Sequence, residues 1–211
     1  MRDVYDFAKF FINNGADSSP NTYDGNMKLQ KLLVFADLAN IAEYGEPLFG
    51  DQVLAFKNGC VVEKVRLRYK NDYVAFYNDS KSYQPDFSER EYEILRLILD
   101  IFGNATAKEL SEINHTFSFW KSAFINGTSS TGYHDKEQSV VDMMSQESDL
   151  NRMREIISAY KETSSEVESS ETINGVTFFF DGFVLTDDLM DQLEQFSLSA
   201  EEDAYSVYMD N

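Results

Sequence analysis

The sequence is poor in the residues that most enzymes use for nucleophilic catalysis and metal binding. Its 211 residues include one cysteine and two histidines. A single cysteine excludes an internal disulfide framework, and two histidines leave little room for histidine-based catalysis. The sequence also contains no GxSxG, HExxH or CxxC motif and no glycine-rich phosphate-binding loop. We therefore expect a protein that is not an enzyme and that uses no cofactor.

Long hydrophobic runs are missing as well. No apolar run approaches the ~20 residues that a membrane-spanning helix needs. The first residues, MRDVYDFAKFF, have acids within their apolar stretch and no small-residue cleavage site, so they do not predict a secretory signal. We expect a cytoplasmic protein that does not associate with membranes. A hydrophobic content of 43% nevertheless predicts a globular chain and not a disordered one.

Positive charge is scarce, and this gives the strongest signal in the composition. Eighteen lysines and arginines stand against 37 acids, for a formal net charge of −19. Residues 161–211 hold thirteen of the acids and a single base. Such a field repels nucleic acid and favours a basic partner surface. We predict a protein partner with a basic surface and no direct binding of nucleic acid.

One apolar helix is expected to organise the fold. Residues 27–44 are apolar on almost all sides, which is typical of a buried helix that other elements surround. Gly45 is placed to end it in the left-handed conformation, and Pro47 prevents its continuation. The residues that follow read as a loop rich in aromatics and glycine. VVEKVRLRYK, residues 61–70, then reads as a second, short helix.

Other helices are predicted from spacing and capping. Residues 3–14 have the periodicity of an amphipathic helix, and Ser88 and Thr106 each begin a capping box that opens a helix. Residues 140–144 and 150–160 are expected to form one broken helix or two. Residues 71–79 are the best strand candidate in the first half, although an irregular extension of the preceding helix fits equally well.

The C-terminal part is predicted to be an appendage. ETSSEVESSE, residues 162–171, reads as a solvated acidic linker. Beyond it, two β-prone runs flank Asp181-Gly182, a strong signal for a two-residue hairpin, and Thr186 caps a helix. Residues 199–211 are expected to be loose. The fold class is mainly α (α+β): a compact helical domain around the buried helix at residues 1–160, and a hairpin-plus-helix appendage at residues 161–211.

The chain contains three ordered motifs: Lys28-Leu29-Gln30-Lys31-Leu32-Leu33; Gly45-Glu46-Pro47-Leu48-Phe49 with Ala55-Phe56, Gly59 and Val61-Val62; and Leu110-Ser111-Glu112-Ile113-Asn114-His115 with Trp120-Lys121. Together these motifs resemble the Panacea domain family, which includes SocA-like proteolytic adaptors, many antitoxins of toxin–antitoxin pairs and GepA-type phage-associated proteins. The chain departs from the family pattern at Phe56, Cys60 and Phe119, where Trp, Pro and Pro are usual. The resemblance implies a helical protein-binding fold.

The candidate partner-binding residues come from these motifs and from the acidic tail. Aromatic residues are usually core, but their place in glycine-rich loops favours a binding patch. For His115 we prefer a simpler interpretation, a hydrogen bond to the last carbonyls of its own helix. The candidates are Phe49, Phe56, Gly59, Val61, Val62, Tyr69, His115, Trp120, Asp187, Asp188, Glu201 and Glu202.

No metal site is expected, because the potential ligands are dispersed at no recognised spacing. If a metal is bound, Cys60, His115, His134 and Asp135 are the ligands to consider.

Two functions fit the sequence. The first is a non-catalytic module that neutralises a protein partner, as an antitoxin or a proteolytic adaptor. The alternative is a phage-encoded anti-CRISPR protein or other inhibitor of a defence nuclease, whose acidic face mimics DNA. The partner is then a toxin or a nuclease, respectively, and a homodimer is left open.

Overall fold

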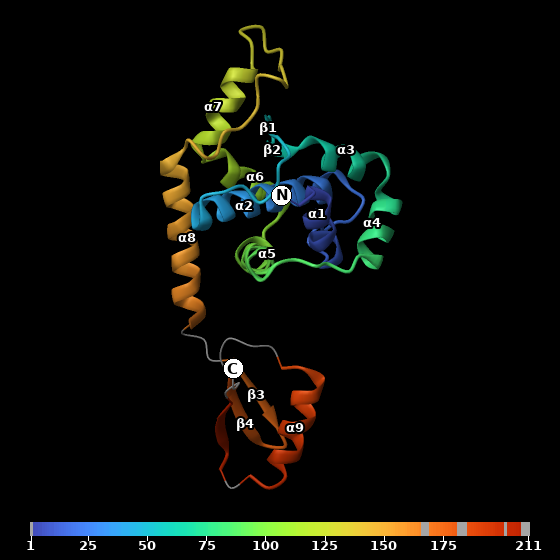
Figure 1. Ribbon diagram of the computed structural model, residues 1–211, viewed down its shortest axis with the longest axis vertical. Helices are drawn as coiled ribbons and strands as arrows, with labels where there is room; N and C mark the ends of the chain where they lie inside the picture. The colour runs from blue at the N-terminus through green and yellow to red at the C-terminus, as the bar shows by residue number, and fades with distance from the viewer. Residues whose placement is uncertain (1, 166–168, 181–184, 201, 208–211) are drawn as a thin grey trace. The chain divides into compact units, whose positions relative to one another are not determined.

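A computed structural model describes residues 2–165, 169–180, 185–200 and 202–207 (Figure 1). Contacts divide the chain into two units, which meet between residues 157 and 158 within a helix. The division into a helical domain at residues 1–160 and an appendage at residues 161–211 stays a proposal. The first unit contains α1 Val4–Asn13, α2 Tyr23–Tyr44, β1 Val53–Phe56, β2 Gly59–Val62, α3 Glu63–Asn71, α4 Tyr73–Ser82, α5 Glu89–Phe102, α6 Ala107–His115, α7 Ser118–Gly127 and the start of α8, Glu147–Ser165.

The predicted buried helix is confirmed as α2. Sixteen of its 22 residues are buried, because α1, α3, α5, α6 and β2 all pack against it (Figure 1). It begins earlier than predicted, since the hydroxyl of Thr22 accepts the Gly25 N–H at 3.0 Å. It ends at Tyr44, where Gly45 has a φ of +75°. Glycine adopts this left-handed conformation without steric cost.

The buried polar residues of α2 are directed at the backbone of the elements around it. Lys28 Nζ donates to the Gly103 carbonyl at the end of α5, at 2.6 Å. Lys31 Nζ donates to the Cys60 carbonyl in β2, at 2.9 Å. Asp37, also on α2, accepts the N–H of Leu48 in the loop after the helix, at 2.7 Å. Buried polar groups are costly unless they are paired in this way, so these bonds determine where each neighbour sits.

Both predicted capping boxes are confirmed, at Ser88 for α5 and at Thr106 for α6. α8 also contributes caps to its neighbours. Asp149 accepts the Phe119 N–H in the first turn of α7 at 2.8 Å, and Arg154 donates to the Ala42 carbonyl near the end of α2 at 2.8 Å. These side chains form hydrogen bonds with backbone groups that have no partner within the helix near its end.

Two predictions for the first unit are wrong, and the alternative left open for residues 71–79 is decided in favour of a helix. Residues 53–62 form the antiparallel hairpin β1–β2 and not a loop, so the following helix starts at Glu63. Residues 73–82 form α4, because Phe76 and Ser80 bury one side of a helix against α1. Residues 140–144 are not helical, because Val141 donates its N–H to the Val53 carbonyl at 2.9 Å and so extends the edge of β1.

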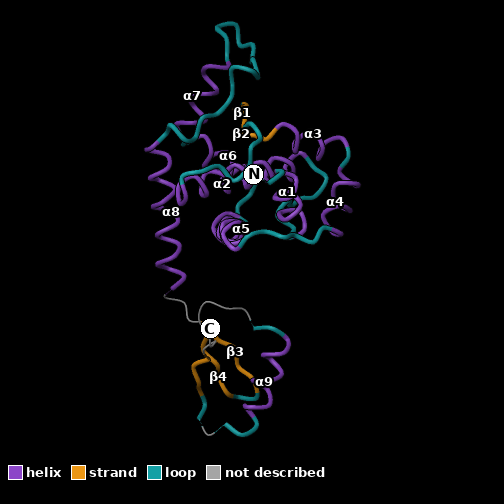
Figure 2. Tube along the Cα trace, viewed as in Figure 1, coloured by secondary structure: helices purple, strands orange, loops and turns teal. Residues whose placement is uncertain are grey.

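In its described part, the second unit contains the end of α8, a three-stranded sheet and one further helix (Figure 2). Antiparallel β3, Ser169–Ile173, and β4, Val176–Phe180, turn at Asn174 and Gly175, which both have positive φ. β5, Ala204–Val207, pairs in parallel with β4. The helix α9, Asp187–Ser197, connects β4 to β5 and begins at the predicted Thr186 cap. The core of this unit is centred on Val176, Phe178 and Leu193.

This arrangement corrects the expectations for the tail. The predicted linker is partly ordered, with residues 162–165 in α8 and 169–171 in β3. The strand at 176–180 forms its hairpin with residues that precede it, and the predicted Asp181-Gly182 turn lies outside the described residues. Residues 204–207 are not loose, because they add a strand to the sheet. The described helices include none with the length and hydropathy to cross a bilayer.

Asp37 makes the stability of the first unit pH-dependent. Burial raises the pKa of this carboxyl to about 7, although backbone N–H groups of Leu48 and Phe49 favour its charged form. The folded state therefore favours the protonated acid. Its contribution is fully present below about pH 4, near the pKa of an unfolded aspartate, and is lost as pH rises to about 7.

We expect Asp37→Asn to reduce this dependence, because the amide stays neutral and its oxygen still accepts the Leu48 N–H. The variant should gain on the order of 2–4 kcal/mol over the native chain at pH 8, and the gain should vanish near pH 4. Urea unfolding at both pH values measures it. Glu137→Gln removes an exposed charge and should show no such pattern; an equal gain for Asp37→Asn at both pH values would refute the assignment.

Candidate functional site

The hairpin β1–β2 is held from several directions by side chains that bind its backbone. Its strands pair from Val53↔Val62 to Phe56↔Gly59, which leaves Lys57 and Asn58 as the turn. On α6, Asn114 accepts the Cys60 N–H at 2.8 Å and Ser111 donates to the Asn58 carbonyl at 3.0 Å. On α7, Trp120 Nε1 donates to the Phe56 carbonyl at 2.9 Å. With Lys31, Gln30 and Ser139 also bonded to it, the hairpin is fixed in place.

Gly59 permits this close approach. Its φ is +93°, and a Cβ at this position would lie 2.6 Å from Lys31 Cε and 2.7 Å from Asn114 Oδ1. Only glycine fits a site where both the backbone conformation and the space exclude a side chain. Gly59 was predicted to contact a partner, and its observed environment is this internal contact.

Cys60 is fully buried in β2, and burial raises the pKa of its thiol to about 12. The thiolate is the form that attacks substrates and binds metals, so this cysteine serves as packing at neutral pH. Within the described residues, no group of three or more His, Cys, Asp or Glu side chains is arranged to hold a metal ion. The ligand set of Cys60, His115, His134 and Asp135 is therefore not brought together.

Five half-buried rings form a continuous row beside the hairpin, which we call the aromatic row: His115, Trp120, Phe124, His134 and Phe56. Neighbouring ring centroids along the row are separated by 4.0, 5.1, 5.3 and 5.6 Å. The row joins α6, α7, the loop after α7 and β1. Offset stacks and edge contacts at these distances stabilise aromatic clusters.

Each histidine of the row has one ring nitrogen in an unusual environment. Nε2 of His115 and Nε2 of His134 are buried and have no hydrogen-bond partner among the described residues. Burial lowers the pKa of His115, and the nearby Lys31 charge lowers it further. The Lys57 backbone in the hairpin turn opposes this shift of the pKa, whereas the sequence favoured an interaction with the carbonyls of its own helix. His115 therefore lies where α6 approaches the hairpin turn.

Four predicted partner contacts lie in the core. The exposed fractions of Phe49, Val61, Val62 and Tyr69 are 2%, 7%, 1% and 2%. Tyr69 donates its hydroxyl hydrogen to Asp17 at 2.7 Å and anchors the loop before α2. These residues support the surface from within.

The acidic candidates are described less fully. Glu202 is exposed, whereas Glu201 and the side chains of Asp187 and Asp188 lie outside the described part of the chain. Their partner-binding role stays a prediction.

Trp120 is half-buried on α7, a helix, and not in a loop as predicted.

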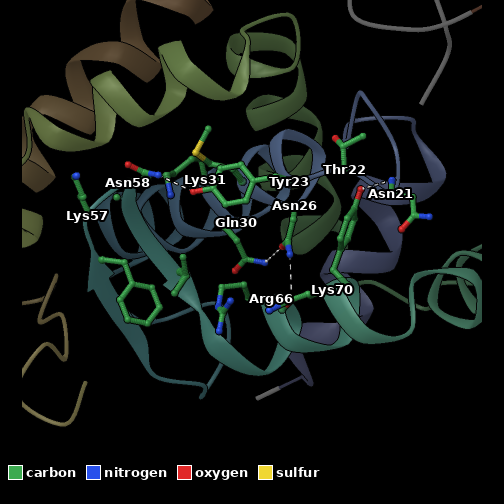
Figure 3. Close-up of a pocket in the computed structure, with 15 residues that line it drawn as sticks. Asn21, Thr22, Tyr23, Asn26, Gln30, Lys31, Lys57, Asn58, Arg66 and Lys70 are labelled. Atoms are coloured by element: carbon green, nitrogen blue, oxygen red, sulfur yellow. Dashed lines mark hydrogen bonds between the residues drawn. The ribbon is translucent and has the colours of Figure 1, made fainter. Parts of the chain in front are cut away.

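A pocket of about 560 Å³ opens on the other side of the hairpin turn. It is lined by the loop before α2, the first half of α2, the hairpin and α3. Figure 3 shows Lys57 and Asn58 at one end and Asn21 and Thr22 at the other. Its volume lies within the range of about 300–1,000 Å³ that is usual for ligand sites.

The pocket is basic, although the chain is strongly acidic. Its lining includes Lys31, Lys57, Arg66 and Lys70 and no aspartate or glutamate. Arg66 is paired with Glu63 at 2.6 Å. Side-chain amides occupy the space between the cations. Gln30 donates to Asn26 at 3.2 Å, and Asn26 donates to the Arg66 carbonyl at 3.1 Å (Figure 3).

The comparison with protein families agrees with the motifs in this region. Residues 29–121 match the family described as "Antitoxin SocA-like, Panacea domain". This segment is similar to a Panacea domain. It runs from α2 to the first half of α7, so it contains the hairpin, most of the pocket lining and three of the five rings of the aromatic row. No curated protein and no solved structure gives a significant match to the chain.

Sequence reasoning missed two members of the row and the pocket. Phe124 follows Trp120 by four residues, and this spacing on one helix predicts stacked side chains, so the signal was available. His134 was considered only as a metal ligand. The basic lining comes from three segments that are separated in the sequence, at residues 31, 57 and 66–70, and no local pattern identifies it.

Two glycines offer a matched test of the hairpin contact. Gly45 and Gly59 both have positive φ, but a Cβ at Gly45 meets nothing within 4 Å. Gly45→Ala should cost only the conformational term of about 1–2 kcal/mol. Gly59→Ala should cost at least about 3 kcal/mol, because it adds a clash with Lys31 and Asn114. Chemical denaturation of the two variants measures the difference; equal losses would show that the hairpin can move away.

Proposed function

We propose that the chain is a non-catalytic, antitoxin-type module that captures and neutralises one protein partner. The observation that carries this proposal is the match of residues 29–121 to the Panacea domain, whose family is described as antitoxin SocA-like. A partner that is inactivated by capture, or presented to a protease, needs a rigid recognition surface and no catalytic group. A hairpin whose backbone is bound by α2, α6 and α7 meets this requirement.

The aromatic row is the surface that we assign to the partner. Next to Phe124 on α7, Ile125 is 69% exposed, and Tyr133 in the loop that carries His134 is 70% exposed. Large side chains on a fixed base are the usual energetic centre of protein interfaces, in which a few aromatic anchors contribute most of the affinity. Phe56, His115 and Trp120 keep their predicted role as part of this surface.

The first test uses Ile125 and Tyr133, whose removal should leave the fold intact because both are exposed. The partner is recovered with the full-length chain and identified, and its toxicity is measured by growth arrest in cells that express it alone. The native chain should restore growth. Ile125→Ala with Tyr133→Ala should weaken binding at least tenfold, about 1.4 kcal/mol, and reduce the rescue.

Val74→Ala is the matched control, because Val74 is an apolar residue 67% exposed on α4. It should bind and rescue as the native chain does. If the double variant retains full affinity while the complex still forms, the aromatic row is not the interface. If the captured protein is harmless to cells, the antitoxin-type role is rejected.

The alternative is an inhibitor of a defence nuclease, such as an anti-CRISPR protein, that imitates DNA. The net charge of −19 favours it, since a field of this size accelerates the approach of a basic surface. Exposed acids of the second unit would then face the nuclease. Those available for a test are Asp191, Glu194, Glu202 and Asp203.

Neutralising these four acids to the corresponding amides should slow association with the recovered partner about tenfold at low salt, and much less at high salt. Dissociation should hardly change. Stopped-flow or surface-based kinetics at two ionic strengths measure both rates. Equal slowing by a control set in the first unit would mean that only total charge matters. That set is Glu89, Glu112, Glu137 and Glu155, all exposed.

A further inference from the structure

Lys31 is a buried cation with no carboxylate partner among the described residues. Its side chain is 1% exposed on α2, and its ammonium donates to one backbone carbonyl, that of Cys60, at 2.9 Å. An ammonium has three N–H donors. A buried charge is costly unless it is paired, and burial accordingly lowers the pKa of Lys31 to about 8. At pH 7 the amine is still mostly charged.

The other cations of the pocket add to this charge. Lys57 and Lys70 are exposed and form no ion pair in the described part of the chain. Lys31, Lys57 and Lys70 therefore leave an excess of positive charge around one cavity, since Glu63 already balances Arg66. A concave site lined by one sign of charge concentrates the field. The charge of the pocket is opposite to that of the whole chain.

The remaining wall of the pocket suits an apolar or planar group. Met27, Phe56 and Val61 line it. The ring of Tyr23 adds a further aromatic surface, and its hydroxyl accepts a hydrogen bond from Asn58 at 2.6 Å. Ligand sites commonly combine such an apolar wall with a few placed polar groups.

We propose that this pocket binds a small organic anion, whose negative charge is attracted by the excess positive charge of Lys31, Lys57 and Lys70 and whose apolar or aromatic body lies against Met27, Phe56 and Val61. The anion supplies the counter-charge that the buried lysine lacks. This ligand site goes beyond the proposed capture of a protein partner. It does not depend on the identity of that partner.

A matched pair of fluorescent probes tests the proposal with the full-length chain. 8-Anilinonaphthalene-1-sulfonate carries an aromatic body and one anionic group, and N-phenyl-1-naphthylamine has the same body without the charge. The sulfonate should bind saturably, one molecule per chain, and at least tenfold more tightly than the neutral probe. Equal affinity of the two probes, or no saturable binding of the sulfonate, would overturn the proposal.

Variants locate the probe. Lys57→Gln with Lys70→Gln should weaken sulfonate binding at least tenfold, and Lys31→Met, a neutral replacement of similar volume, should do the same. Lys108→Gln with Lys121→Gln changes the net charge equally but lies outside the pocket lining, so its affinity should match that of the native chain. Circular dichroism confirms that each variant is folded. Unchanged affinity in both folded pocket variants, or an equal loss in the control pair, would place the probe elsewhere.

Discussion

Hydrogen bonds from one buried helix to the backbone of its neighbours hold the first unit together. α2 places its polar side chains where an ordinary core helix has apolar ones, and each binds a main-chain group. Lys28 binds the end of α5, Gln30 and Lys31 bind β2, and Asp37 binds the loop after α2. Because a buried polar group without its partner costs free energy, a helix with this pattern tolerates only one arrangement of its neighbours. The Lys-Leu-Gln-Lys sequence in its first half therefore specifies how the neighbouring elements pack against the helix.

The hairpin is the point at which this frame meets solvent. It contributes to both surfaces, since Phe56 belongs to the aromatic row and also lines the basic pocket. The two surfaces differ in chemistry. Aromatic rings beside exposed Ile125 and Tyr133 suit a protein surface, and an excess of lysines around a cavity suits a small anion. Both surfaces depend on the same rigid strands.

The sequence predicts those elements whose signals are local. The apolar sides of α2, the left-handed Gly45 and the capping boxes at Ser88 and Thr106 each act within a few residues, and all are confirmed. The hairpin at 53–62 was not predicted. Asn58-Gly59 between two β-prone runs is a hairpin signal, but the aromatic and glycine content of this stretch also fits the loop that we expected. At residues 73–82 the sequence leaves a strand and a helix equally open, because the inward side of this helix is decided by contact with α1. The pocket is lined by lysines from separate segments of the sequence, so it can be identified only when the fold is known.

Bonds that end on the main chain of β1 and β2 also have an evolutionary consequence. The anchors at Cys60, Val62, Asn58 and Phe56 hold carbonyl and amide groups that every residue possesses, so the exposed turn residues Lys57 and Asn58 can be exchanged without breaking these bonds. Most of the strand side chains are buried and Gly59 makes room for Lys31, so these positions are constrained. A scaffold built in this way can acquire new binding specificities by substitution on the hairpin turn and the exposed side of α7 while its architecture persists.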